Sequence, residues 1–117
     1  MIRRSPTQVS GDAAEGRALA YLSGRGMHLI GRNVASRLGE IDLVMRDGDT
    51  IVFVEVRSRA HSDFGGAAAS VGQAKQRRLR REAQRYLNAH FGDRWPACRF
   101  DVCALDGAAI DWIRDAF

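Results

Sequence analysis

The feature that most constrains the fold is a predicted β-hairpin near the middle of the chain. Asp47-Gly48-Asp49-Thr50 lies between two segments rich in branched apolar residues, 40–46 and 51–57. Glycine at the first position of a two-residue turn suits a type II′ hairpin, whose twist matches that of the flanking strands. A turn at Gly48-Asp49 therefore predicts which residues pair across the hairpin.

Residues alternate between the two faces of a strand, so the turn also predicts which side chains lie together. One face is expected to be wholly apolar and buried, and consists of Ile41, Leu43, Met45, Val52, Val54 and Val56. The other face is apolar near the turn, where Val44 is opposite Phe53. It becomes charged toward the open end, where Asp42 is opposite Glu55 and Glu40 is opposite Arg57.

The predicted pair of Asp42 and Glu55 indicates a metal site. Opposed residues have Cβ atoms about 5 Å apart, and two carboxylates this close raise the pKa of one of them unless a cation lies between them. Mg²⁺ or Mn²⁺ prefers such oxygen ligands, with water and substrate phosphate completing its shell. The alternative is a surface pair neutralised by Arg57 and other arginines. A one-residue change in the turn register would place the two carboxylates on different faces.

The remaining elements predict an α/β fold of order αβββαβ with a small C-terminal addition. We expect helices at 10–24, capped by Ser10, and at 71–91, and strands at 27–35, 40–46, 51–57 and 98–105. Residues 58–70 read as a loop, and 110–112 as a short strand or turn. Residues 1–8 are expected to form a flexible basic tail, and residues 9–117 a single domain.

Glu15 lies on the apolar stripe of the first predicted helix, which also contains Ala18, Leu19 and Leu22. A glutamate on the packing side of a helix needs a partner, and the carboxylate cluster of the sheet would provide one through a metal ion or water. Alternatively, Glu15 reaches solvent from the N-terminal edge of the stripe.

The second predicted helix is strongly basic. Its buried stripe is predicted to contain Leu79, Ala83, Tyr86, Leu87 and Phe91. Four arginines lie outside that stripe and are candidates for contacts with nucleic-acid phosphates: Arg77, Arg80, Arg81 and Arg85. A solvated basic face is the alternative. Lys75, the only lysine of the chain, lies one turn before Leu79 and is expected to point toward the body of the protein.

Composition adds weaker indications. The formal charge of +4 favours an anionic partner such as nucleic acid, although a bias toward arginine in the source genome would give the same charge. The apolar runs are too short to span a membrane, and the N-terminus lacks a secretory signal, so we expect a cytoplasmic protein. Cys98 and Cys103 are five residues apart on a predicted strand and are expected to be reduced, packed thiols on opposite faces.

Four segments together resemble the YraN family of uncharacterised bacterial proteins. They are Gly39-Glu40-Ile41-Asp42-Leu43, Val52-Phe53-Val54-Glu55-Val56-Arg57, Lys75-Gln76-Arg77-Arg78-Leu79 and Arg99-Phe100-Asp101-Val102. The family is similar to archaeal Holliday-junction resolvases and to the PD-(D/E)XK nuclease superfamily. The resemblance implies a restriction-endonuclease-like αβββαβ core, a mixed sheet flanked by helices.

The same resemblance implies metal ligands at Asp42 and Glu55, an acidic residue at Glu15 and a catalytic lysine two residues after the glutamate. Arg57 occupies that last position. Arginine remains protonated and cannot act as a base, although it can stabilise charge on a phosphate. Lys75 is therefore a candidate to replace the missing lysine.

These inferences predict an endonuclease that depends on Mg²⁺ or Mn²⁺ and acts on DNA. Branched, Holliday-junction-like DNA is implied by the resemblance alone, and a homodimer would suit that substrate. The alternative is a nucleic-acid-binding protein that retains the nuclease fold but has lost catalysis. Arg57 at the lysine position is the main observation in favour of that alternative.

Overall fold

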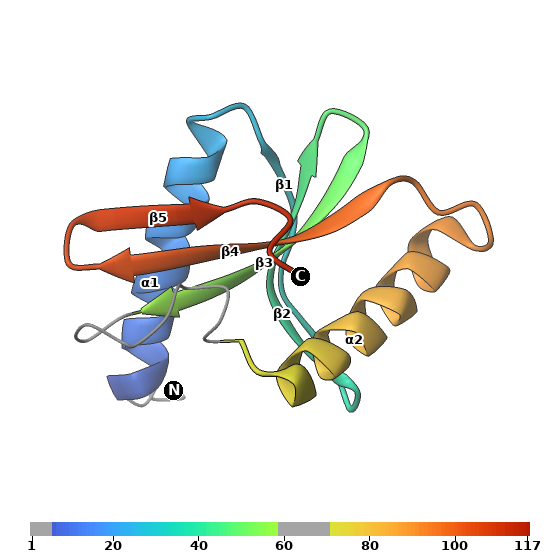
Figure 1. Cartoon of the computed structure of the whole chain (residues 1–117), viewed down its shortest axis with the longest axis horizontal. Helices are drawn as coiled ribbons and strands as arrows, with labels where there is room; N and C mark the ends of the chain where they lie inside the picture. Colours follow the sequence, from blue (N-terminus) through green and yellow to red (C-terminus); the bar gives the residue numbers. More distant parts are fainter. Residues whose placement is uncertain (1–5, 59–70) are drawn as a thin grey trace, which may run out of the picture.

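The computed structural model describes residues 6–58 and 71–117, and of residues 6–10 only the helical backbone. Figure 1 shows a sheet with the two helices packed against it. The elements in chain order are α1 (Pro6–Ser23), β1 (His28–Ser36), β2 (Gly39–Asp47), β3 (Thr50–Ser58), α2 (Gln73–Phe91), β4 (Cys98–Asp106) and β5 (Ala109–Ile113). The predicted αβββαβ order is confirmed, and the C-terminal addition is a strand.

The five strands form one mixed sheet in the order β1-β2-β3-β4-β5. β3 and β4 are parallel, and the other neighbouring pairs are antiparallel. Parallel neighbours need a crossover connection, and the segment that contains α2 provides it. The carboxyl end of β3, which carries Glu55, therefore leads into the connection to α2.

The predicted hairpin register is confirmed from the turn as far as Leu43. Leu43 pairs with Val54 and Val44 pairs with Phe53. Gly48 has φ +59°, a conformation that glycine adopts without the steric cost that a Cβ brings. This value agrees with the first position of a type II′ turn.

The two faces of the sheet bury separate apolar clusters, one under each helix. The cluster under α1 contains Ala14, Ala18, Leu22, Met27, Leu43, Met45, Val52, Val54, Cys103 and Leu105. The cluster under α2 contains Ile41, Val44, Ile51, Phe53, Val71, Leu79, Ala83, Tyr86, Leu87, Val102 and Ala104. Both predicted helix stripes are thus buried, and the sheet is covered on both faces.

The prediction for Ile41 was wrong. Ile41 belongs to the cluster under α2, whereas Leu43 and Met45 belong to the cluster under α1. The alternation fails just where the pairing between β2 and β3 ends, because beyond Leu43 the carboxylate of Asp42 accepts the N–H of Val56. Strict alternation presupposes a continuous ladder, and the sequence does not reveal where a ladder stops.

The predicted boundaries of the helices also needed correction. α1 begins at Pro6, so Ser10 lies inside the helix rather than at its N-cap, and residues 6–8 of the predicted tail are helical. Proline suits a first helical turn because its missing N–H would be unpaired there in any case. α2 begins at Gln73, two residues later than predicted. Most of the predicted loop at 58–70 and residues 1–5 lie outside the described residues.

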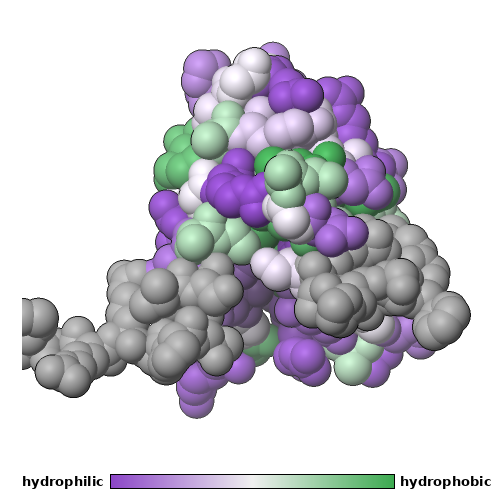
Figure 2. Space-filling view, turned by 90° about the vertical axis from the view of Figure 1, so that its left-hand side faces the viewer, coloured by the Kyte–Doolittle hydropathy of each residue, from purple (hydrophilic) through white to green (hydrophobic). Residues whose placement is uncertain are grey.

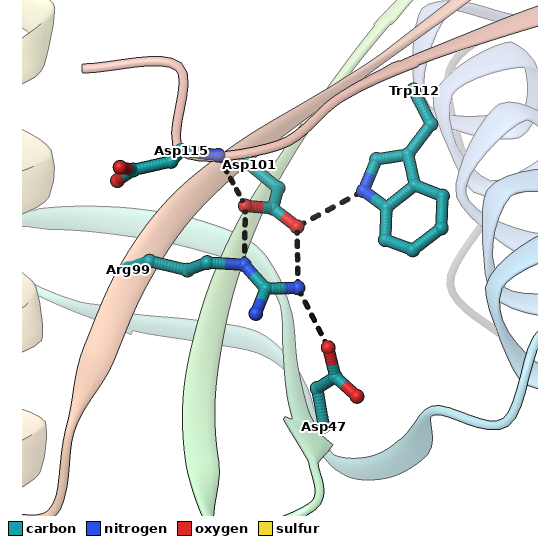
Figure 3. A network of polar contacts seen from close by, with 5 residues as sticks. All are labelled: Asp47, Arg99, Asp101, Trp112 and Asp115. Carbon is teal, nitrogen blue, oxygen red and sulfur yellow. Dashed lines mark hydrogen bonds and ion pairs between the residues drawn. The ribbon is translucent and has the colours of Figure 1, made fainter.

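The C-terminal strands are joined by a buried carboxylate, that of Asp101 on β4 (Figure 3). Asp101 accepts hydrogen bonds from both Nε and an Nη of Arg99, at 3.0 and 3.2 Å, from Nε1 of Trp112 at 2.9 Å and from the backbone N–H of Asp115 at 2.9 Å. Arg99 also donates to Asp47 at 3.0 Å. These contacts attach β5 and the chain end to the sheet.

Both cysteines are free thiols, as predicted, but only Cys103 is buried, whereas Cys98 is exposed. Burial, with contributions from Asp101 and Asp111, raises the pKa of Cys103 to about 12.

The surface is mixed in character on the side drawn in Figure 2. Hydrophobic residues form small patches there, separated by hydrophilic ones. Among the described residues, no helix has both the length and the hydropathy that a membrane-spanning helix requires.

Candidate active site

The site begins where β2 and β3 separate. The pairing between these strands ends at Leu43 and Val54, and the next residue on each strand toward the open end carries a carboxylate, Asp42 and Glu55. Oδ2 of Asp42 accepts the backbone N–H of Val56 at 2.8 Å. Asp42 thus takes the place of a backbone acceptor, and this bond fixes the side chain beside β3.

Both carboxylates line a hollow of about 220 Å³ between the sheet and the N-terminal half of α2. Its lining residues are Gly39, Glu40, Asp42, Glu55, Lys75, Arg78 and Leu79. We call this the carboxylate hollow. It is large enough for several water molecules, and its wall combines carboxylates with cations.

Gly39 allows β2 to approach α2 at this point. A Cβ on Gly39 would lie 2.9 Å from the carbonyl oxygen of Arg78 and 3.3 Å from its carbonyl carbon. A backbone neighbour cannot move aside as a flexible side chain can, so a larger residue would push the strand and the helix apart. The glycine therefore sets the width of the carboxylate hollow.

Lys75 reaches the buried carboxylate from α2. Its Nζ lies 2.6 Å from Oε1 of Glu55, whose side chain is only 5% exposed. The nearest guanidinium nitrogen of Arg57 lies 3.9 Å from the same oxygen. The prediction that Lys75 points toward the body of the protein is confirmed. The ammonium group of Lys75, rather than the guanidinium of Arg57, makes the close contact with Glu55.

Asp42 has a strongly raised pKa in this site. The pKa of Asp42 rises from 3.8 to about 7. Burial is the main cause of this rise, and the negative charge of Glu55 is the second. The hydrogen bond from Val56 and the charge of Lys75 act in the opposite direction, and Glu15 adds a smaller repulsion. A carboxyl that titrates near neutral pH in a hollow, against a second carboxylate, is typical of functional sites.

Glu15 is buried, with 8% of its surface exposed, so the alternative in which it reaches solvent is wrong. Its ion-pair partner is Arg32 on β1, with Nε of Arg32 3.5 Å from Oε1 of Glu15. Arg32 also donates to the backbone oxygen of Asp12 at 3.0 Å. In the part of the chain that the structure describes, no three Asp, Glu, His or Cys side chains come together as a metal-binding group.

The donor set of the hollow fits a hard divalent cation. Asp42 and Glu55 supply carboxylate oxygens, and the repulsion that raises the pKa of Asp42 is what a bound cation would relieve. Among the residues that the structure describes, the ammonium of Lys75 is the cation closest to Glu55. Two carboxylates leave most coordination positions for water and for phosphate oxygens, as is usual for Mg²⁺.

The four arginines of α2 that were predicted to contact phosphates divide into two groups. Arg77, Arg80 and Arg81 are exposed. Arg85 instead donates from Nε to Glu82 at 2.7 Å and forms an ion pair with that residue. The guanidinium of Arg85 is thus already paired with a buried carboxylate, which makes it a weaker candidate for a phosphate contact than the other three.

Glu82 was missed by the sequence analysis. It is fully buried, and it also accepts a hydrogen bond from the hydroxyl of Ser36 at the end of β1. The signal was present, because Glu82 lies three residues after Leu79 on the buried stripe, the same spacing that identified Glu15. Arg78, which lines the carboxylate hollow, was missed as well.

The fold and the site define a class of protein: a mixed α/β domain that holds two carboxylates and a lysine together in a hollow at the open end of a hairpin. Comparison with known proteins gives the family. Residues 14–105 match the uncharacterised protein family UPF0102, and the chain belongs to this family.

Its relatives carry the same description. The chain is 58% identical over 112 residues to a UPF0102 protein of Ralstonia nicotianae, covering 92% of this chain and 85% of the relative. It is 50% identical over 113 residues to a UPF0102 protein of Alkalilimnicola ehrlichii, covering 97% of this chain and 90% of the relative. The chain is also 51% identical over 115 residues to a UPF0102 protein of Halorhodospira halophila, covering 98% of this chain and 91% of the relative.

Proposed function

We propose that this protein is a metal-dependent endonuclease that hydrolyses phosphodiester bonds in DNA. The observation that carries the proposal is the juxtaposition of Asp42, Glu55 and Lys75 in one hollow, with Nζ of Lys75 2.6 Å from Glu55. A carboxylate pair beside a fixed cation is the arrangement expected for phosphoryl transfer, which needs positioning and charge stabilisation rather than covalent chemistry.

Asp42 and Glu55 would hold Mg²⁺ or Mn²⁺. Such an ion, when bound, would lower the pKa of a coordinated water and neutralise charge on the scissile phosphate. Lys75 supplies the positive charge that stabilises the phosphate as negative charge develops on it. Arg57 lies on the same side of Glu55 and adds a second cation, although it cannot act as a base.

Arg78 at the hollow and the exposed Arg77, Arg80 and Arg81 on α2 would hold the phosphate backbone. Contacts of this kind position a duplex without reading its sequence. Branched DNA and a two-fold dimer remain part of the proposal through the family resemblance. Comparing cleavage of four-way junctions with cleavage of linear duplexes, beside sedimentation of the protein, addresses both.

The test combines calorimetric titration of Mn²⁺ and Mg²⁺ with cleavage assays on branched and linear DNA. Asp42→Asn and Glu55→Gln should each lose metal binding and reduce cleavage by at least about 100-fold. Asp49→Asn is the matched control, because Asp49 is an exposed carboxylate at the opposite end of the same hairpin. This variant should bind metal and cleave DNA as the parent does.

Nucleic-acid binding without metal binding or cleavage would overturn the proposal. That outcome would assign the protein to the alternative class, a binding protein on a nuclease-like fold. In that class Lys75 and Glu55 form a purely structural ion pair, and their removal would alter stability but no rate of cleavage.

A further inference from the structure

A second hollow lies on the other flank of α2, against the start of β4. It has a volume of about 190 Å³ and is lined by Arg80, Ala83, Gln84, Leu87, Trp95, Cys98 and Phe100. We call this the aromatic hollow. The carboxylate hollow contacts α2 through Lys75, Arg78 and Leu79, so the two hollows share the helix but none of their lining residues.

Trp95 forms an exposed but fixed wall of the aromatic hollow. It is 42% exposed, yet its Nε1–H is shared between Oδ1 of Asn88 at 3.1 Å and the backbone oxygen of Gly92 at 2.9 Å. Gly92 ends α2 with φ +61°. A non-glycine residue adopts this conformation only with strain, so the turn that aims Trp95 depends on glycine.

The rest of the wall is aromatic and cationic. Phe100 stacks on Phe117 with ring centroids 5.0 Å apart and an interplanar angle of 22°. The guanidinium of Arg80 lies over both rings, 5.9 Å from the centroid of Phe100 and 5.6 Å from that of Phe117. These cation–π contacts hold an exposed positive charge at the rim of an apolar hollow.

An exposed, preorganised indole beside a fixed arginine matches one ligand chemistry well. An unpaired nucleobase presents a flat apolar face for stacking, and the phosphate next to it carries the charge that Arg80 complements. A paired base cannot enter such a hollow, because both of its faces are covered by its neighbours in the duplex.

We propose that the aromatic hollow binds an unpaired nucleobase of the DNA substrate by stacking on Trp95. This proposal rests on the proposed function and specifies its substrate class, DNA with unpaired nucleotides close to the cleaved bond. The exposed Arg77 and Arg81 lie on α2, the helix that the two hollows share, and would contact the intervening phosphates.

The separation of the hollows indicates how many nucleotides are involved. They lie on either flank of a helix whose diameter with side chains is about 10–12 Å. An unpaired strand that runs from one hollow to the other must pass across a helix of this width, which requires an overhang of a few nucleotides. A duplex with a three-nucleotide overhang is therefore a suitable probe.

The test measures binding by fluorescence anisotropy in EDTA, so that cleavage does not interfere. Labelled blunt duplex is compared with the same duplex carrying a three-nucleotide thymidine overhang. The parent should bind the overhang DNA about tenfold more tightly than the blunt duplex, which is within the range that one stacked base contributes. Trp95→Ala should lose this preference and retain its affinity for the blunt duplex.

Leu29→Ala is the matched control, because Leu29 is an exposed apolar side chain of similar exposure, 44%, on β1. It should keep the tenfold preference. Equal affinity of the parent for both DNAs would overturn the proposal for the aromatic hollow. Metal-dependent cleavage would still be tested separately by the Asp42 and Glu55 variants. No DNA binding by the parent would overturn both proposals.

A second measurement does not depend on a Trp95 variant that folds. Cys98 is exposed in the aromatic hollow, whereas Cys103 is buried, so a thiol reagent should modify Cys98 in the folded parent. The overhang DNA should slow this modification, and the blunt duplex should not. Absence of this protection would overturn the proposal. Protection that grows with protein concentration alone, together with a dimer in sedimentation, would assign the hollow to a second copy of the chain.

Discussion

Asp42→Asn is expected to remove a large part of the pH dependence of folding stability in the absence of divalent ions. The pKa of Asp42 is about 7 in the folded protein, against 3.8 for an ordinary aspartate. Since the folded state holds the proton more tightly, the free energy of unfolding falls as the pH rises from about 4 to about 7. Stability contributed by the protonated carboxyl is present at low pH and is lost at neutral pH.

The magnitude follows from the two pKa values. Integrated between pH 5 and pH 8, the difference amounts to a loss of about 2.5 kcal/mol in the parent, and the full range from 3.8 to about 7 corresponds to roughly 4 kcal/mol. Asparagine resembles the protonated aspartate, and its amide oxygen can still accept the N–H of Val56. The variant should therefore match the parent only well below pH 4, and should exceed its stability by about 1.7 kcal/mol near pH 5 and by roughly 4 kcal/mol near pH 8.

The assay is urea unfolding followed by circular dichroism at several pH values between 5 and 8, with EDTA present. Parallel pH profiles for the parent and Asp42→Asn would refute the assignment of a raised pKa to Asp42. Added Mn²⁺ should then stabilise the parent at pH 8 and leave Asp42→Asn unchanged, because an ion that binds only the folded state stabilises it by mass action. If Mn²⁺ stabilised both proteins equally, its binding would not depend on the carboxylate of Asp42.

Three further predictions concern other parts of the molecule. Lys75→Met removes the ammonium that lies 2.6 Å from Glu55. The variant should bind Mn²⁺ more tightly in calorimetry, and it should cleave DNA about 100-fold more slowly. Unchanged cleavage would show that the lysine has no catalytic role. Asp101→Asn replaces a carboxylate that accepts four hydrogen bonds. This substitution should lower the free energy of unfolding by about 3 kcal/mol in urea titrations. A loss of less than about 1 kcal/mol would contradict this prediction. At pH 8, Cys98 should react with a thiol reagent in the folded protein, whereas Cys103, with a pKa of about 12, should react only after unfolding; mass spectrometry of the modified peptides distinguishes the two.

The local elements could be predicted because each depends on neighbouring residues. The Gly48 turn is specified by turn chemistry, and its register placed Asp42 and Glu55 at the same end of the hairpin. Helical periodicity identified the buried stripes and the inward direction of Lys75. These inferences use spacings of a few residues, which the folded chain preserves.

Partner choice could not be predicted, because it depends on which distant residues the fold brings together. Glu15 was expected either to meet the carboxylates of the sheet through a metal ion or water or to reach solvent; it is buried, and it forms an ion pair with Arg32 on an edge strand. The ion pair between Arg85, a predicted phosphate contact, and the buried Glu82 was not predicted. In both cases an arginine neutralises a buried glutamate, because a buried charge requires a partner.

The sequence by itself therefore determined the α/β class, the order of the elements, the hairpin register and the family. Only the tertiary structure decided the parallel pairing of β3 with β4, the position of Lys75 rather than Arg57 beside Glu55, and the two hollows on either flank of α2. The physical reason is that backbone propensity and side-chain periodicity act over one or two turns. Burial, charge pairing and the width of a hollow arise only when both faces of the sheet are covered.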